Sequence, residues 1–397
     1  MARRATRALA LLGAVLGVGC DGADPHPVPS LSDGYFGINA QLVRELSLRG
    51  GEGLASRHLD SIQELGVSFV RDNTDWVSLE PAPPRNGRRS YDYSLSDRWV
   101  RQLARRGLRW QPTVIGVTTP QWAASRLAYS VCAERSPPGP AALADLVAGL
   151  ARRYGRGGSF WSEHPRLRAR PVIEYEVWNE PNHGGFWCPA PDPAAYARVF
   201  LAADEAVEGV DPRARVLLGG LAGFEVSSPT AAPPTMAVGE FVSQMVAAEP
   251  ELTAAVDRIG LHPYASDPAA VLDRIRGFAT ELRALGLRAP IAVNEIGWPT
   301  QGTGSVPPLE EAVRAAYVGE VVTSIPKLDC GVDSIAPHTW VTPELDPSDP
   351  EHWFGIASPT TTAPYPTAQA YAERIDLLSR GATTESPVGT VTPCPER

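Results

Sequence analysis

The segment Val172-Ile173-Glu174-Tyr175-Glu176-Val177-Trp178-Asn179-Glu180-Pro181-Asn182 decides the fold, because an apolar β-branched run passes abruptly into a polar turn. The segment Pro290-Ile291-Ala292-Val293-Asn294-Glu295-Ile296-Gly297-Trp298 makes the same transition. Each pattern predicts a buried strand that ends at a glutamate, Glu180 in the first segment and Glu295 in the second. Two carboxylates at strand ends are the smallest set of catalytic groups with which most enzymes hydrolyse a glycosidic bond.

Strand and helix patterns alternate along the rest of the chain. Apolar runs predict strands at residues 34–39, 67–72, 109–115, 172–178, 216–220, 257–262, 290–295 and 332–340. Amphipathic stretches predict helices at residues 54–65, 94–106, 141–154, 192–207, 238–248, 268–285, 309–324 and 365–379. This alternation predicts an α/β fold, a (β/α)8 TIM barrel forming a single catalytic domain over residues 33–380. A doubly wound open sheet is the alternative, which the lack of a Gly-x-Gly-x-x-Gly turn after the first predicted strand disfavours.

The composition narrows the class of partner. The 397 residues are 43% hydrophobic and 20% charged, as in ordinary globular proteins. The net charge is −9, and Lys and Arg cluster only near the N-terminus. This balance argues against nucleic acid and against an anionic membrane surface as the partner.

The N-terminus resembles a targeting segment. Arg3, Arg4 and Arg7 precede a short apolar run at residues 8–18, which predicts a signal peptide over residues 1–20 and an exported protein. Cys20 follows Leu16-Gly17-Val18-Gly19, which resembles the lipobox of bacterial lipoproteins, although Gly17 stands where that motif prefers Leu. We expect Cys20 to be lipidated and the protein to sit in the cell envelope; a plain secretory signal and a secreted protein are the alternative. Residues 21–32 are Pro-rich and predict a tether, and residues 381–397 predict an irregular tail.

Export makes the other four cysteines candidates for disulfides. Three connectivities are possible. Cys132 and Cys188 both lie in loops after predicted strands, whereas Cys330 precedes a strand and Cys394 lies in the tail. We therefore favour Cys132–Cys188 and Cys330–Cys394. A zinc site is the alternative, but no Cys-x-x-Cys spacing supports it.

Polar and aromatic side chains mark the ends of five predicted strands. They are Arg71-Asp72-Asn73, Asn179-Glu180, His262-Pro263-Tyr264, Asn294-Glu295 and His338-Thr339-Trp340. In a (β/α)8 barrel the carboxyl ends of the strands meet at one face, where the active site lies. We therefore expect these groups to converge.

On these motifs the chain resembles glycoside hydrolase clan A, the retaining (β/α)8-barrel glycosidases with catalytic glutamates after strands four and seven. Asn179-Glu180-Pro181 resembles the clan's Asn-Glu-Pro element, and Asn294-Glu295-Ile296-Gly297-Trp298 resembles its nucleophile strand. Arg71 and His262-Pro263-Tyr264 resemble its strand-two arginine and strand-six His/Tyr element. Within the clan, residues 176–182 are most similar to family 39-like and cellulase-like proteins.

The resemblance implies a role for each of these residues. Glu180 is expected to be the general acid and then the general base, and Glu295 the nucleophile, held ionised by Arg71 and the Tyr264 hydroxyl. Asn179 is expected to bind the sugar 2-hydroxyl. The remaining expected substrate contacts are His262, which touches substrate or supports the carboxylates, Trp340 as the stacking floor, and Trp298 in a sugar subsite.

The leading hypothesis is an O-glycoside hydrolase acting on a polysaccharide or oligosaccharide by double displacement. It is expected to be a monomer that needs no cofactor and no catalytic metal, touching the membrane only through the possible lipid anchor. One alternative is a non-catalytic carbohydrate-binding barrel, which the presence of both glutamates disfavours. Another is a transglycosidase acting on cell-surface polysaccharide with the same residues.

Overall fold

The computed structural model describes residues 31–32, 34–114, 118–382 and 391–394. The predicted signal peptide, Cys20 and residues 21–30 of the predicted tether lie outside the described residues, as does most of the tail. Within the described ranges, every helix is too short or too polar to cross a bilayer.

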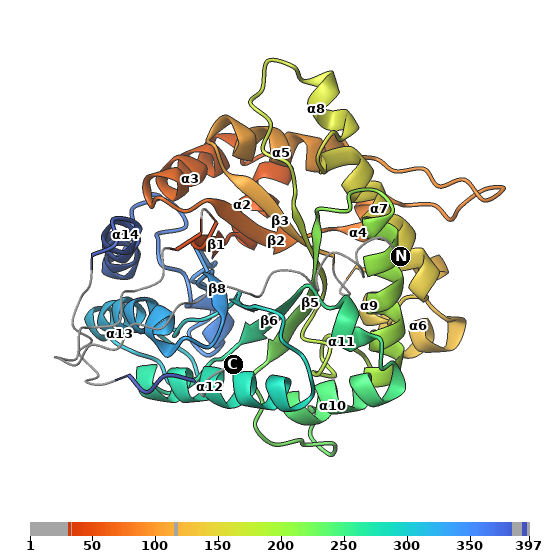
Figure 1. Ribbon diagram of the computed structural model, residues 1–397. Coiled ribbons are helices and arrows are strands. Elements are labelled where there is room, and N and C mark those ends of the chain that lie inside the picture. Colours follow the sequence, from red (N-terminus) through yellow and green to blue (C-terminus); the bar gives the residue numbers. More distant parts are fainter. Residues whose placement is uncertain (1–30, 33, 115–117, 383–390, 395–397) are drawn as a thin grey trace, which may run out of the picture.

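The described residues form one parallel sheet of eight strands in the order β1 to β8 (Figure 1). The strands are β1 (Gly37–Asn39), β2 (Phe69–Asn73), β3 (Arg109–Val114), β4 (Glu174–Asn179), β5 (Arg215–Ala222), β6 (Arg258–His262), β7 (Ile291–Val293) and β8 (Val332–Ile335). A parallel bridge between Phe36 and Ile335 joins the first strand region to the last and closes the barrel. The predicted (β/α)8 fold is therefore confirmed.

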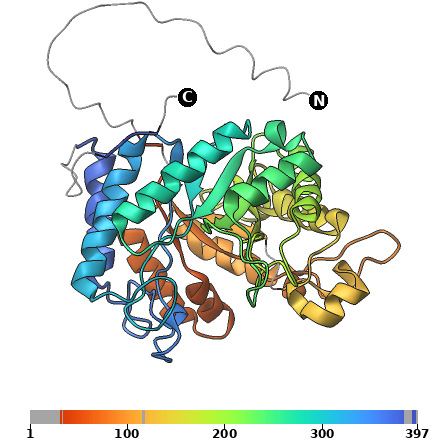
Figure 2. The same cartoon turned by 90° about the horizontal axis from the view of Figure 1, so that it is seen from below.

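Helices surround the strands as an outer layer in both views (Figures 1 and 2). The longer ones are α2 (Gln41–Leu48), α3 (Glu52–Glu64), α5 (Ser94–Arg105), α7 (Pro140–Tyr154), α9 (Pro193–Glu208), α10 (Val238–Ala248), α12 (Pro268–Ala284), α13 (Glu311–Ser324) and α14 (Pro366–Ser379). Short helices are α4 (Trp76–Leu79), α6 (Arg126–Cys132), α8 (Ser159–Glu163) and α11 (Leu252–Ala255). Single 3₁₀ turns are η1 (Gln121–Ala123), η2 (Ala133–Arg135), η3 (Ile325–Leu328) and η4 (Pro350–His352).

Each predicted helix is present, and the sequence explains where several begin. Asp192 and Asp267 cap α9 and α12 by accepting hydrogen bonds from the backbone N–H groups of Ala195 and Ala270. A proline occupies the first turn of both helices, where its missing N–H costs nothing. The prediction missed α2 and the four short helices, which are inserted beside the regular barrel units.

The end of the barrel interior away from the site holds a network of buried charges. Arg258 is 1% exposed and donates to Glu174 at 2.7 Å and to Asp333 at 2.6 Å. Arg215 pairs with the same two carboxylates. Paired in this way, the charges avoid the large penalty of an isolated buried ion. Glu174 therefore has a structural role at this end of the barrel.

Two disulfides tie loops and tail to the barrel. Cys132 pairs with Cys188 and Cys330 with Cys394, with Cα atoms 5.7 Å and 5.1 Å apart. These are the predicted pairs. The first bond joins α6 to the loop after β4, and the second holds residues 391–394 against the barrel near η3, where the Cys394 N–H donates to the Leu328 carbonyl.

Gly220 on β5 is a position where the fold tolerates no side chain. A Cβ there would overlap the imidazole of His262 on β6. We expect Gly220→Ala to lower the free energy of unfolding by about 1–3 kcal/mol, the usual cost of overpacking a core. Urea unfolding followed by tryptophan fluorescence measures this.

Gly277→Ala is the matched control, because a Cβ at that α12 position meets nothing within 4 Å. Replacing this helical glycine should raise the free energy of unfolding by about 0.5–1 kcal/mol. Equal effects of the two substitutions would contradict the close approach of β5 and His262.

Candidate active site

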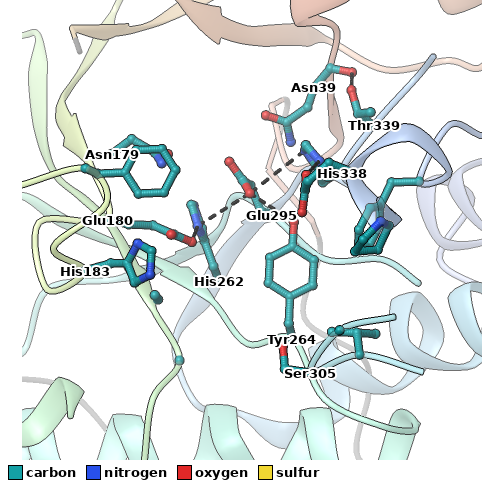
Figure 3. Close-up of a pocket in the computed structure, with 18 of the residues that line it drawn as sticks. Asn39, Asn179, Glu180, His183, His262, Tyr264, Glu295, Ser305, His338 and Thr339 are labelled. Carbon is teal, nitrogen blue, oxygen red and sulfur yellow. Dashed lines mark hydrogen bonds and ion pairs between the residues drawn. The ribbon is translucent and has the colours of Figure 1, made fainter. Parts of the chain in front are cut away.

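A cavity of about 650 Å³ opens where the carboxyl ends of the strands meet. Its walls include Arg71, Asn179, Glu180, His262, Tyr264 and Glu295, six of the eight predicted catalytic or substrate-contacting residues. Figure 3 shows Glu295 between Glu180 and His262 on one side and His338 on the other. The expected convergence of strand-end residues is therefore present.

Arg71, in the middle of β2, organises the site. It is 3% exposed, and its Nε and Nη2 donate to the two oxygens of Glu176 at 2.6 and 2.9 Å. Its Nη1 donates to Glu295 Oε1 at 2.6 Å and to Asn39 Oδ1 at 2.8 Å, and Nη2 also reaches Asn179 Oδ1 at 2.9 Å. Burial alone would lower the pKa of Arg71, but Glu176 and Glu295 outweigh it and raise that pKa. Arg71 is thus a permanent cation, and each of its guanidinium nitrogens donates to a side-chain oxygen of the site.

Glu295 is held as a carboxylate. Its Oε1 accepts from Arg71, and its Oε2 accepts from the Tyr264 hydroxyl at 2.9 Å. Burial alone would raise the pKa of Glu295, but His262, Arg71 and His338 oppose it and, with the Tyr264 hydrogen bond, lower that pKa to about 2. A largely buried carboxylate that stays ionised in this way is a ready nucleophile at neutral pH.

Glu180 follows directly after β4 and occupies a different environment. Its backbone N–H donates to the Gly220 carbonyl at 2.9 Å, and its Oε1 lies 2.8 Å from His262 Nδ1. The backbone around it takes positive φ angles, 71° at Trp178 and 44° at Glu180. Such angles cost of order 1–3 kcal/mol each at non-glycine residues and persist only where surrounding packing enforces them. The turn therefore aims the Glu180 side chain into the cavity.

Asn179 has its amide orientation set by Arg71. Because Arg71 donates to Oδ1, the amide nitrogen is at the other end of the group, as a donor for a ligand in the cavity. Asn39 is fixed in the same way, since its Oδ1 accepts from Arg71 while its Nδ2 donates to the Asn294 carbonyl at 2.8 Å.

Glu180, His262 and Glu295 offer ligand atoms that all lie within 4.8 Å of one another, a spacing that would suit a metal ion. Both oxygens of Glu295 already accept from Arg71 and Tyr264. A cation at this point would also sit beside the Arg71 guanidinium, which like-charge repulsion disfavours. The donor set fits two carboxylates with separate roles better than a metal site.

Two expected substrate contacts are wrong. Trp340 is fully buried, and its indole N–H donates to His58 Nδ1 at 3.0 Å, on the α3 side of the barrel wall. Trp298 is 1% exposed and donates to the Ala265 carbonyl at 2.9 Å. Neither tryptophan is among the described residues that line the cavity. Both indoles pack into the core, where their large apolar area is removed from water.

His338, not Trp340, faces the cavity at the end of β8. The strand stops at Ile335, three residues earlier than the side chain that enters the site, so period-two alternation does not carry through to residues 338–340. Asn39 was also missed, although it ends β1 and the strand-end rule applied to the first predicted strand would have found it. His183, Phe186 and Phe224 line the cavity from loops that carry no sequence signal.

No protein-family model matches the sequence. No curated protein matches it either. The structure, however, is similar to solved glycosidases whose aligned sequences are less than 25% identical to this one.

A monomeric β-xylosidase from Caulobacter crescentus CB15 superposes with a TM-score of 0.59 at 19% identity, covering 86% of this chain and 68% of that one. A family 39 glycoside hydrolase from Xanthomonas axonopodis pv. citri superposes with a TM-score of 0.62 at 18% sequence identity, covering 88% of this chain and 68% of that one. A family 51 α-L-arabinofuranosidase from Bifidobacterium longum superposes with a TM-score of 0.58 at 15% sequence identity, covering 89% of this chain and 75% of that one. The chain therefore shares the barrel fold of these glycosidases, as its resemblance to clan A predicted.

Tyr264→Phe tests the electrostatics of Glu295. The substitution removes one hydrogen bond to the ionised form, so the pKa of Glu295 should rise from about 2 toward its ordinary value. An NMR titration of the carboxyl carbon in ¹³C-labelled glutamate measures this shift.

Tyr35→Phe is the matched control, since the buried Tyr35 hydroxyl lies on the Asp333 side of the barrel, away from the cavity. It should leave the Glu295 titration unchanged. An unchanged Glu295 pKa in Tyr264→Phe would show that the hydroxyl does not hold the carboxylate ionised.

Proposed function

We propose that this protein is a retaining β-glycosidase that hydrolyses O-glycosidic bonds of a polysaccharide or oligosaccharide by double displacement. The observation that carries the proposal is the closeness of two carboxylates in unlike surroundings. An oxygen of Glu180 and one of Glu295 lie within 4.8 Å. Retaining glycosidases hold their carboxyl groups roughly 5–5.5 Å apart, whereas inverting enzymes leave about 6.5–9.5 Å for a water.

In the first step Glu295 attacks the anomeric carbon while Glu180 protonates the glycosidic oxygen. The bond from the anomeric carbon to that oxygen breaks, the aglycone leaves as an alcohol, and a glycosyl ester forms on Glu295. The Arg71 and Tyr264 contacts keep Glu295 ionised for this attack. The His262 contact holds the Glu180 carboxyl on the leaving-group side.

In the second step water replaces the aglycone. The ester has removed the charge of Glu295, so Glu180 no longer has a second carboxylate beside it and is favoured as the anion that takes the proton of water. The resulting hydroxide attacks the anomeric carbon and releases Glu295. Two inversions give net retention.

Asn179 supplies the contact that is expected to strengthen in the transition state. Its amide nitrogen is presented as a donor beside the nucleophile, where the 2-hydroxyl of the reacting sugar would lie. Arg71 donates hydrogen bonds to both Asn179 and Glu295. The amide that binds the 2-hydroxyl and the nucleophile are therefore held in a fixed relative position.

We further propose that the enzyme acts as an exported monomer. Two disulfides fit an oxidising compartment, and a structural neighbour is described as monomeric. Lipidation at Cys20 remains part of the proposal. Mass spectrometry of the native protein would detect a diacylglycerol on that cysteine.

Glu295→Ala should abolish turnover of every substrate, because no other described group is placed to form the glycosyl ester. Glu180→Ala should lower kcat on natural glycosides by about 10²–10⁴-fold, the usual contribution of general acid–base catalysis. A panel of oligosaccharides and polysaccharides assayed for reducing ends measures both.

The two variants should differ with an aryl glycoside whose leaving group needs no protonation. Glu180→Ala should then complete the first step, and added azide should restore turnover and yield the β-glycosyl azide. Azide rescue of Glu295→Ala to a β-azide, or full activity in either variant, would contradict the assigned roles.

A further inference from the structure

The side of the cavity beyond the nucleophile carries an ion pair that the two chemical steps do not use. His338 Nδ1 lies 3.9 Å from Glu295 Oε2, and its Nε2 lies 3.5 Å from Glu351 Oε2. The His338 side chain is 23% exposed and that of Glu351 is 68% exposed. The imidazole thus connects the nucleophile to a carboxylate on the rim of the cavity.

The His338 ring is held in place by aromatic neighbours. Its centroid is 5.3 Å from that of Phe354 and 6.3 Å from that of Tyr264, both in edge-to-face arrangements. Burial alone would lower the pKa of His338, but Glu295 and Glu351 outweigh it and raise that pKa. The ring is therefore a fixed donor at the cavity wall.

The contacts of Glu295 define which way a sugar must lie. Arg71 binds Oε1 and also Asn179, so the 2-hydroxyl side of the sugar is the Oε1 side. Tyr264 binds Oε2, and His338 lies nearest Oε2 as well. Figure 3 shows Asn179 and His338 on opposite sides of Glu295.

In a pyranose the anomeric carbon is flanked by C2 on one side and by the ring oxygen and C5 on the other. With C2 at Asn179, the ring oxygen lies toward Tyr264, and the substituent at C5 extends toward His338 and Glu351. The pair therefore borders the one part of the reacting sugar that distinguishes hexoses, pentoses and uronic acids.

We propose that His338 and Glu351 bind the hydroxymethyl group at C5, so that the substrates are hexopyranosides and not pentopyranosides or uronic acids. The inference rests on the proposed glycosidase function and names the sugar class for the same site.

The pair offers what a hydroxyl needs. An imidazole N–H donates to the hydroxyl oxygen, and the Glu351 carboxylate accepts its proton. A pentopyranoside has no group at this place and leaves both unused. A uronic acid would bring a third carboxylate beside Glu351 and Glu295, and like charges repel.

Aryl β-glycosides that share one leaving group test the proposal. The wild type should hydrolyse at least one of the gluco, galacto and manno substrates about 10-fold or more faster in kcat/KM than the xyloside, the contribution of one hydrogen bond. Glu351→Ala and His338→Ala should each bring this ratio toward one. Because the ratio is taken within one variant, a general loss of activity does not affect it.

Glu351→Gln separates charge from hydrogen bonding. It keeps an acceptor oxygen, so it should retain more of the hexoside preference than Glu351→Ala, while raising the relative rate on the β-glucuronide. Glu225→Gln is the matched control: Glu225 lines the same cavity but pairs with Arg274 at 3.1 Å. Both ratios should stay at their wild-type values in this variant.

A wild type fastest on the xyloside, or a hexoside preference unchanged in Glu351→Ala, would overturn the inference while leaving the glycosidase function standing. Failure to hydrolyse any aryl glycoside, oligosaccharide or polysaccharide would instead contradict the proposed function. Calorimetry then decides the inference without turnover: a piperidine iminosugar that carries the hydroxymethyl group should bind more tightly than its analogue without it. Equal binding would overturn it.

Discussion

The site depends on one buried cation, the guanidinium of Arg71. Its five donated hydrogen bonds join Asn39 of β1, Glu176 and Asn179 of β4, and Glu295 in the loop after β7. A buried charge is tolerable only when it is paired and its hydrogen bonds are satisfied; removing one partner of such a pair typically costs about 3–5 kcal/mol. The same contacts that make Arg71 tolerable in the barrel therefore keep Glu295 ionised and orient Asn179.

The chemistry follows from an asymmetry around this cation. Arg71 and Tyr264 bond Glu295 directly, whereas Glu180 contacts His262 and stands on a turn with strained backbone angles. Two carboxylates within 4.8 Å of each other are thus placed in environments that suit nucleophile and proton donor. His338 lies between Glu295 and Glu351 and so links the nucleophile to the rim of the cavity, where the proposed contact with the C5 hydroxymethyl group selects the sugar class.

The barrel was predictable because its signals are local: apolar runs of strand length, amphipathic stretches of helix length and polar residues at each transition. The same rule located Arg71, Asn179, Glu180, His262, Tyr264 and Glu295. It failed at β8, where the strand ends at Ile335 and the following backbone turns Trp340 toward His58 and His338 toward the cavity. Which of two nearby side chains enters a site after a strand ends is decided by loop packing. Glu351 lies on η4, and the segment that follows is held by contacts distant in sequence, since the Thr300 N–H and the Arg314 guanidinium both donate to the Trp353 carbonyl.

The central claim is that Glu295 becomes covalently glycosylated. A 2-deoxy-2-fluoro β-glycoside with an activated leaving group slows both steps, and deglycosylation becomes slow enough for the ester to accumulate. Incubation with this compound should raise the intact mass of the protein by one fluoroglycosyl unit, and peptide mapping should place it on Glu295. Attachment to Glu180, or turnover of the unmodified glycoside with inversion at the anomeric carbon, would contradict the account.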